Sequence, residues 1–80
     1  MKLSIYSLKK VLFQGSAQLL NCKTQLGEIT VLDNHEPLII VLTKGTARIK
    51  DDTGNEHFLE IKSGFLEVRQ ENEVRCIVEQ

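Results

Sequence analysis

The sequence predicts an all-β fold, a small β-sandwich of about eight to ten short strands, and three observations support this prediction. β-Branched residues are abundant, with thirteen Ile and Val and five Thr, whereas only two residues are Ala, the strongest helix former. Apolar and polar residues alternate in short runs, as in strands with one buried face. Turn-forming residues recur about every ten residues, which is the spacing typical of sandwiches and barrels.

In the first half of the chain, residues 3–8, 19–24 and 27–32 alternate and are predicted to be strands. Residues 8–14 also fit a helical turn, and we interpret them as a strand. Residues 37–43 are apolar on both faces, so this strand is either central in the sheet or covered by something else. Of these two, burial in the core is the interpretation that we favour.

In the second half, residues 45–51, 56–62, 64–70 and 73–80 complete the series of strands. Glycine and asparagine separate the runs because they adopt the positive φ of tight turns. The predicted turns lie at Gly15, Gly27, 33–34, Gly45, 51–55, 63–64 and 71–72.

Composition predicts one domain, residues 1–80, that is soluble and intracellular. The net charge is −1, divided as +1 over residues 1–40 and −2 over residues 41–80, so no basic block favours nucleic-acid binding. No apolar run approaches the ~20 residues of a membrane helix, and Lys9 and Lys10 interrupt any signal-peptide core. Cys22 and Cys76 both fall at apolar positions, which favours reduced core residues and leaves a disulfide open.

The sequence offers little that favours an enzyme. It lacks nucleophile-elbow and phosphate-loop motifs, and its carboxylates are scattered about one to a strand. His35 and His57 lie twenty-two residues apart without a partner at metal-ligand spacing, so we expect neither a metal nor a cofactor. A binding or assembly module is the function class that remains.

An apolar patch on an outer face is predicted from three residues. In residues 56–62 the alternation leaves Phe58 outside, and in residues 73–80 it leaves Ile77 outside. If Phe65 lines up with them, a docking surface with charged neighbours forms. The alternative is that a kink at residues 63–64 turns Phe65 inward.

Five segments then resemble a known family over the range from about Leu3 to Glu79. Residues 27–38, GEITVLDNHEPL, resemble the pattern G-E-[LF]-G-[IV]-[LY]-P-G-H-A-P-L of the N-terminal β-sandwich domain of the F-type ATP synthase epsilon subunit. Thr30, Asp33, Asn34 and Glu36 depart from it. Asn34 replaces a glycine and still reaches a left-handed conformation. The other segments are similar to F-x-G, P-G-x-[VI]-R-I, G-G-F-L-E-V and N-x-V, and they lie at residues 13–15, 44–49, 63–68 and 72–74.

The resemblance implies a non-catalytic rotor subunit of the central stalk, which links the gamma subunit to the c-ring and couples ion translocation to ATP synthesis. It implies a peripheral location at the cytoplasmic face of the cell membrane, with membrane association only through the complex. Glu28, His35 and Pro37 match the loop end that lies near the c-ring and gamma in this family, and Phe58, Phe65 and Ile77 would form the gamma-docking face. One hypothesis is that Glu28 meets a basic loop of the c subunit, and the alternative is that Glu28 is a solvated turn residue. The other overall interpretation is an unrelated sandwich that binds a peptide or a sugar.

In this family a C-terminal helical hairpin follows the sandwich and can inhibit ATP hydrolysis. The sequence reaches Gln80, where the sandwich ends. The resemblance therefore carries over the structural role of the sandwich and not the inhibitory role of the hairpin.

Overall fold

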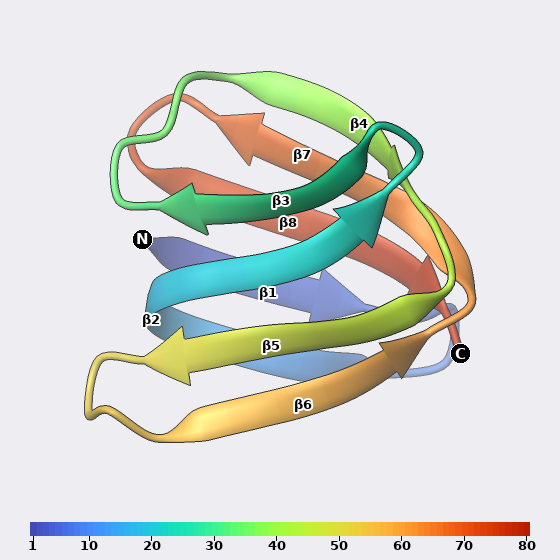
Figure 1. Cartoon of the computed structure of the whole chain (residues 1–80). Helices are drawn as coiled ribbons and strands as arrows, with labels where there is room; N and C mark the ends of the chain where they lie inside the picture. The colour runs from blue at the N-terminus through green and yellow to red at the C-terminus, as the bar shows by residue number, and fades with distance from the viewer.

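The computed structural model describes residues 1–80 and consists of β-strands and their connections, without a helix (Figure 1). This confirms the all-β prediction, and the number of strands is eight. In chain order they are β1 (Lys2–Tyr6), β2 (Val11–Thr24), β3 (Gly27–Leu32), β4 (Leu38–Leu42), β5 (Gly45–Asp51), β6 (Glu56–Ile61), β7 (Ser63–Arg69) and β8 (Glu73–Glu79). Since no helix is present, none could cross a membrane.

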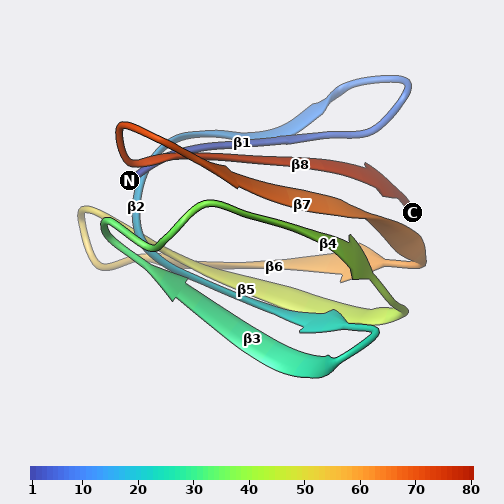
Figure 2. The same ribbon diagram turned by 90° about the horizontal axis from the view of Figure 1, so that it is seen from above.

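The strands form two layers that β2 joins. In the first layer β1, β8, β7 and β4 are neighbours in this order, and only the pair β1–β8 is parallel. In the second layer β3, β2, β5 and β6 are neighbours and all pairs are antiparallel. β2 belongs to both layers because residues 11–16 pair with β1, whereas residues 17–24 pair with β5 and β3. Figure 2 shows β1, β7 and β8 on one side of the sandwich and β3 and β5 on the other.

The inward-facing side chains of the alternating strands form the core between the two layers. It contains seventeen buried apolar residues, among them Leu3, Leu20, Ile49 and Leu66. Burying a side chain of this size stabilises the fold by roughly 1.5–3 kcal/mol compared with leaving it exposed. The alternation therefore predicted correctly which face of most strands is buried.

Cys22 and Cys76 are both buried and both free. Loss of water around the thiol raises the pKa of Cys22 to about 11, and burial raises the pKa of Cys76 even further. At neutral pH the two side chains are protonated thiols that pack as small apolar groups. This is the interpretation favoured from the sequence.

β2 differs from the prediction, which divided this region into two strands with a turn at Gly15. The turn lies earlier, because the Ser7 hydroxyl accepts hydrogen bonds from the amides of Lys9 and Lys10, both at 3.2 Å. Gly15 instead pairs with Leu3 inside the ladder. The strand passes from one layer to the other with a register shift between Ala17 and Leu19, so one long strand replaces two short ones.

The turn predicted at residues 63–64 is also wrong. β6 ends at Ile61 and β7 begins at Ser63, with Lys62 alone between them. Gly64 is required here for a different reason, since a Cβ on it would lie 2.3 Å from the carbonyl oxygen of Ile77. Its backbone also has a positive φ of 156°. This glycine permits the close approach of β7 and β8.

Candidate docking face

The outer side of the first layer carries four exposed apolar residues, which we call the apolar face. Ile39 and Val41 come from β4, Phe65 from β7 and Ile77 from β8, with exposed fractions of 72%, 37%, 57% and 49%. Their neighbours along the strands point the other way into the core, for example Leu66 at 0%. The alternation therefore gives these strands an apolar residue on both sides.

The register brings three of these residues into one row across the sheet. Val41 is the partner of Phe65, and Phe65 is the partner of Ile77. On the next strand Tyr6 is paired with Ile77, so an aromatic ring extends the row to β1. Directly opposed side chains on one face are close enough to pack together, and the row therefore forms a continuous apolar strip.

Two charged residues, Glu67 of β7 and Arg75 of β8, border this strip. Glu67 is paired with Ile39 on one side and with Arg75 on the other. Ile39, Phe65, Glu67, Arg75 and Ile77 together line a shallow depression of about 230 Å³. An apolar centre with a charged border is the arrangement found where proteins dock on one another.

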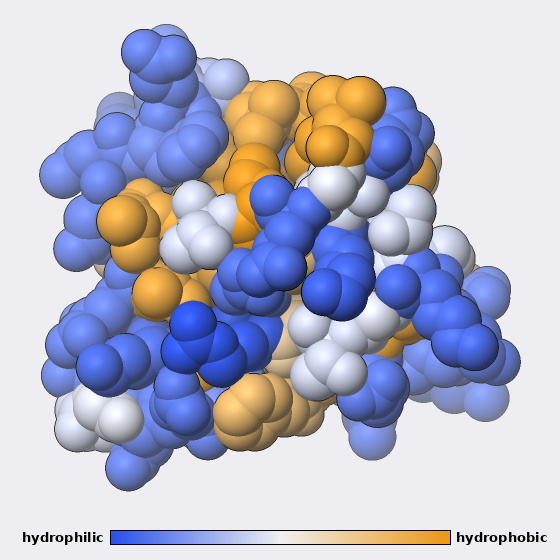
Figure 3. Space-filling view, in the orientation of Figure 1, coloured by the Kyte–Doolittle hydropathy of each residue, from blue (hydrophilic) through white to orange (hydrophobic).

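The structure separates Phe58 from this face. Phe65 is exposed and lines up with Ile77, so the alternative of a kink that buries it is wrong. Phe58 is also exposed, at 60%, but it lies on β6 opposite Arg48 of β5, in the second layer. Figure 3 views the side of the sandwich on which β3 and β5 lie, where hydrophilic residues cover the centre and apolar areas lie toward the edges.

Sequence reasoning missed Ile39 and Val41 as members of the face, because it favoured burial for a strand that is apolar on both sides. Only Ile40 and Leu42 of this strand are buried. The signal was present in the uninterrupted run of apolar residues from Leu38 to Leu42. In a small sandwich no third layer exists to cover the second side of such a strand.

Glu28 lies at the beginning of β3, next to the turn between β2 and β3. Its carboxylate accepts a hydrogen bond from the Asn21 side-chain amide at 2.9 Å and forms an ion pair with Lys23 at 3.6 Å. The hydrogen bond from Asn21, and then the positive charge of Lys23, lower the pKa of Glu28. Glu28 is thus an exposed carboxylate that stays ionised and is held in position.

His35 and Pro37 lie at the other end of β3, in the connection to β4. The expectation that they share one loop end with Glu28 is therefore wrong, since a six-residue strand separates the two positions (Figure 1). Asn34 has a φ of 60° and so takes the left-handed conformation expected of it. Its amide donates a hydrogen bond to the Asn72 side chain at 2.7 Å, which ties this connection to the turn between β7 and β8.

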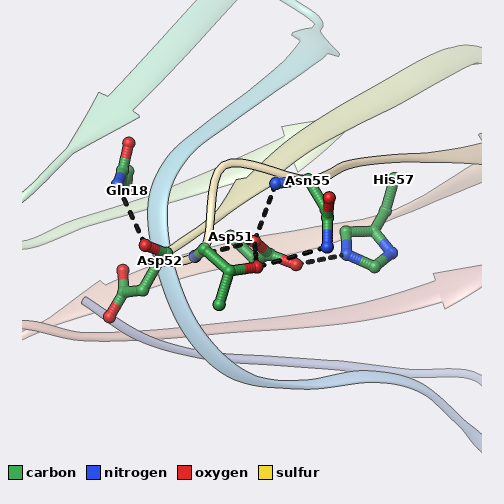
Figure 4. A network of polar contacts seen from close by, with 6 residues as sticks. Gln18, Asp51, Asp52, Asn55 and His57 are labelled. Atoms are coloured by element: carbon green, nitrogen blue, oxygen red, sulfur yellow. Dashed lines mark hydrogen bonds and ion pairs between the residues drawn. The ribbon is translucent and has the colours of Figure 1, made fainter.

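The hairpin between β5 and β6 is organised by Asp51 (Figure 4). The Asp51 carboxylate accepts hydrogen bonds from the Thr53 amide at 2.9 Å and from the Asn55 amide at 3.0 Å. Its other oxygen is 2.8 Å from Nε2 of His57, and this contact is the main cause that lowers the pKa of Asp51, followed by the Thr53 hydroxyl. The network closes a turn, as predicted for residues 51–55. The structure contains no group of three or more His, Cys, Asp or Glu that could hold a metal ion.

Comparison with known proteins gives this geometry its context. The sequence matches the family described as the ATP synthase delta/epsilon chain, β-sandwich domain, over residues 1–80. A curated relative, the ATP synthase epsilon chain of Nitrosococcus oceani, is 32% identical over 69 residues. That match covers 86% of this chain and 49% of the relative, so the chain spans about half the length of the curated relative that it matches.

Two solved structures share the fold over the whole chain. One is a chain of the Euglena gracilis mitochondrial ATP synthase, solved with OSCP, F1 and c-ring, with a TM-score of 0.93, 21% identity and 51% of that chain covered. The other is a chain of the central stalk and c-ring of the Tetrahymena thermophila mitochondrial ATP synthase, with a TM-score of 0.86, 14% identity and 63% covered. The family match over residues 1–80 and the curated relative exclude an unrelated peptide- or sugar-binding sandwich. The chain belongs to the ATP synthase delta/epsilon β-sandwich family.

Proposed function

We propose that this chain is a non-catalytic rotor component of an F-type ATP synthase, and that the apolar face binds the gamma subunit. The whole of residues 1–80 acts as one sandwich domain in this role. It ties gamma to the c-ring at the cytoplasmic face of the cell membrane, and so couples ion translocation to ATP synthesis.

The observation that carries the proposal is the strip Val41–Phe65–Ile77 on the outside of the first layer. Aromatic and aliphatic side chains exposed in one row are unfavourable in water, and a protein partner removes them from it. Family membership supplies the partner, because the solved relatives are parts of ATP synthase assemblies that include the central stalk or the c-ring.

Only one of the two predicted contact segments can lie nearest the c-ring, since Glu28 and the His35–Pro37 segment lie at opposite ends of β3. We assign the c-ring contact to the end that carries Glu28, because its held carboxylate fits a basic loop. His35 and Pro37 then point away from the ring. In this orientation the apolar face, which lies on the outer side of the first layer, stays free for gamma.

The test is copurification of the chain with the gamma subunit of the same synthase after coexpression. We expect Ile77→Asp to leave the circular dichroism spectrum unchanged and to abolish copurification, because it places a charge in the centre of the apolar face. Phe58→Asp is the matched control, since it changes an exposed apolar residue of the other layer and should leave the complex intact. Retention of gamma by Ile77→Asp, with Phe58→Asp alone disrupting the complex, would contradict the assignment of the face.

A second measurement addresses coupling. Removing the chain from an assembled synthase should lower ATP-driven ion pumping, and adding it back should restore pumping. The Ile77→Asp variant should fail to restore it. If pumping is the same with and without the chain, the coupling role is wrong even where gamma binds.

A further inference from the structure

A polar recess lies beside the apolar face, on the outer side of the first layer. It has a volume of about 320 Å³, and its lining comes from β1, β8 and the first part of β2. The polar side chains of this lining that form no hydrogen bond and no ion pair within the chain are those of Lys2, Ser4, Tyr6, Gln14, Ser16 and Arg75. Arg75 also lines the depression of the apolar face, so the two hollows adjoin.

The strand register explains why the surface is hollow at this place. Ser4 lies at the centre, because it is paired with Arg75 of β8 on one side and with Gln14 of β2 on the other. Lys2 and Tyr6 are the next residues of β1 on the same side of the sheet, each roughly 7 Å away along the strand. A short serine surrounded by four long side chains leaves a recess above its hydroxyl group.

The recess has an excess of positive charge. Neither Lys2 nor Arg75 forms an ion pair within the chain, although Arg75 lies opposite Glu67 in the register of β7 and β8. Glu73 also lines the recess, but its carboxylate is paired with the Arg69 guanidinium at 3.1 Å. Two cations therefore remain without a counter-charge, beside hydroxyl and amide groups that donate hydrogen bonds.

This set of donors fits a carboxylate group. An arginine can donate two parallel hydrogen bonds to the two carboxylate oxygens, and such charge-assisted bonds are stronger than bonds between neutral groups. Two surface cations hold a free carboxylate only weakly, because water and salt screen the attraction. A carboxylate that belongs to a protein covering the apolar face is brought to the recess by the rest of the contact, and the same contact removes water around it.

We propose that the gamma subunit inserts an aspartate or glutamate side chain into this recess, where it pairs with Arg75 and Lys2. The inference rests on the proposed function, in which gamma covers the adjoining apolar face. The recess begins at the turn between β7 and β8, since the Lys2 amide donates to the Asn72 carbonyl at 2.9 Å, and it lies away from the end that carries Glu28. The apolar strip thus supplies contact area, and the ion pair fixes the orientation of gamma on it.

The test is titration calorimetry of the full chain with the gamma subunit of the same synthase, in low and in high salt. Arg75→Gln should lower the affinity about tenfold or more in low salt, and Lys2→Gln by a smaller factor. In high salt both variants should approach the wild type, because salt screens the ion pair that they lack. The matched control is Lys50→Gln, which removes a positive charge from a half-buried residue of the second layer and should bind gamma as the wild type does.

The carboxylate of gamma is identified by replacing each of its aspartates by asparagine and each of its glutamates by glutamine. One replacement should weaken binding to the wild type about tenfold and have little further effect on binding to Arg75→Gln, which is the coupling expected of a direct pair. Undiminished affinity of Arg75→Gln in low salt, or additive losses at every acidic residue of gamma, would overturn this inference. If Ile77→Asp still abolishes the complex in that case, the proposed function stands, whereas a wild type that does not bind gamma would overturn both.

Discussion

The outer faces of the two layers differ in whether their side chains form hydrogen bonds and ion pairs with one another. On the second layer, polar side chains pair with one another, as Asn21 does with Glu28 and Thr30, and as Arg48 does with Glu56 at 2.7 Å. On the first layer, the central row consists of apolar side chains that have only each other. A surface of the first kind is complete in water, whereas one of the second kind needs a partner. This difference is the reason why the proposed gamma contact is assigned to the first layer.

Gly64→Ala should have the largest effect, because it disrupts the pair of strands that carries Phe65 and Ile77. The new Cβ would lie 2.3 Å from backbone and would occupy a residue with positive φ. We expect a loss of about 2–4 kcal/mol in the free energy of unfolding, measured by urea denaturation.

Gly15→Ala is the control for this variant, since nothing lies within 4 Å of a Cβ at that position. It should cost clearly less than Gly64→Ala. Similar losses for both glycines would show that conformational freedom, and not the close approach of β7 to β8, is what Gly64 supplies.

Phe65→Ser and Phe58→Ser sharpen the comparison of the two faces. The two rings are exposed to nearly the same extent, 57% and 60%, so we expect both substitutions to change stability by a similar amount, within about 1 kcal/mol. Only Phe65→Ser should weaken the complex with gamma. Affinity by titration calorimetry, beside thermal melts, separates the two effects, and equal losses of affinity would remove the distinction between the faces.

The same comparison shows how far the sequence predicts this molecule. Alternation predicted the buried sides of the strands, because burial on one face is a local property of each strand. It did not place Phe58, since the layer to which β6 belongs depends on its pairing with β5. The long strand β2 was also missed because its extent depends on pairing with another strand. Glycine is typical of a turn, but Gly15 pairs with Leu3 of β1 inside the ladder.

The candidate site was only partly predictable. The alternation of apolar and polar residues predicted that Phe65 and Ile77 face outward, and in the structure the two residues are partners across β7 and β8. Ile39 and Val41 could not be placed in this way, because a strand that is apolar on both sides has two interpretations until the number of layers is known.

Asp51→Asn tests whether the polar network of the second layer stabilises the fold. The folded-state pKa of Asp51 lies below the unfolded value of about 3.9, so its contribution is present above that value and is lost as the pH falls through the folded pKa. Thermal melts of the wild type should therefore show a falling Tm below about pH 4. In Asp51→Asn the fall should be shallower and Tm at pH 7 should be lower. An unchanged pH profile would show that other carboxylates cause the acid sensitivity.

The smallest effect is expected for the ion pair of Arg48 and Glu56, which bridges β5 and β6. Its side chains are 39% and 43% exposed, so solvent screens the attraction and the pair contributes about 0.2–1 kcal/mol. A double-mutant cycle with Arg48→Gln and Glu56→Gln should give a coupling energy in this range that decreases in high salt. Arg48 also lies opposite Phe58 in the register of β5 and β6, in the layer that the proposed gamma contact does not use. The cycle should accordingly leave gamma binding unchanged, and a loss of binding in the double variant would mean that the partner also contacts this layer.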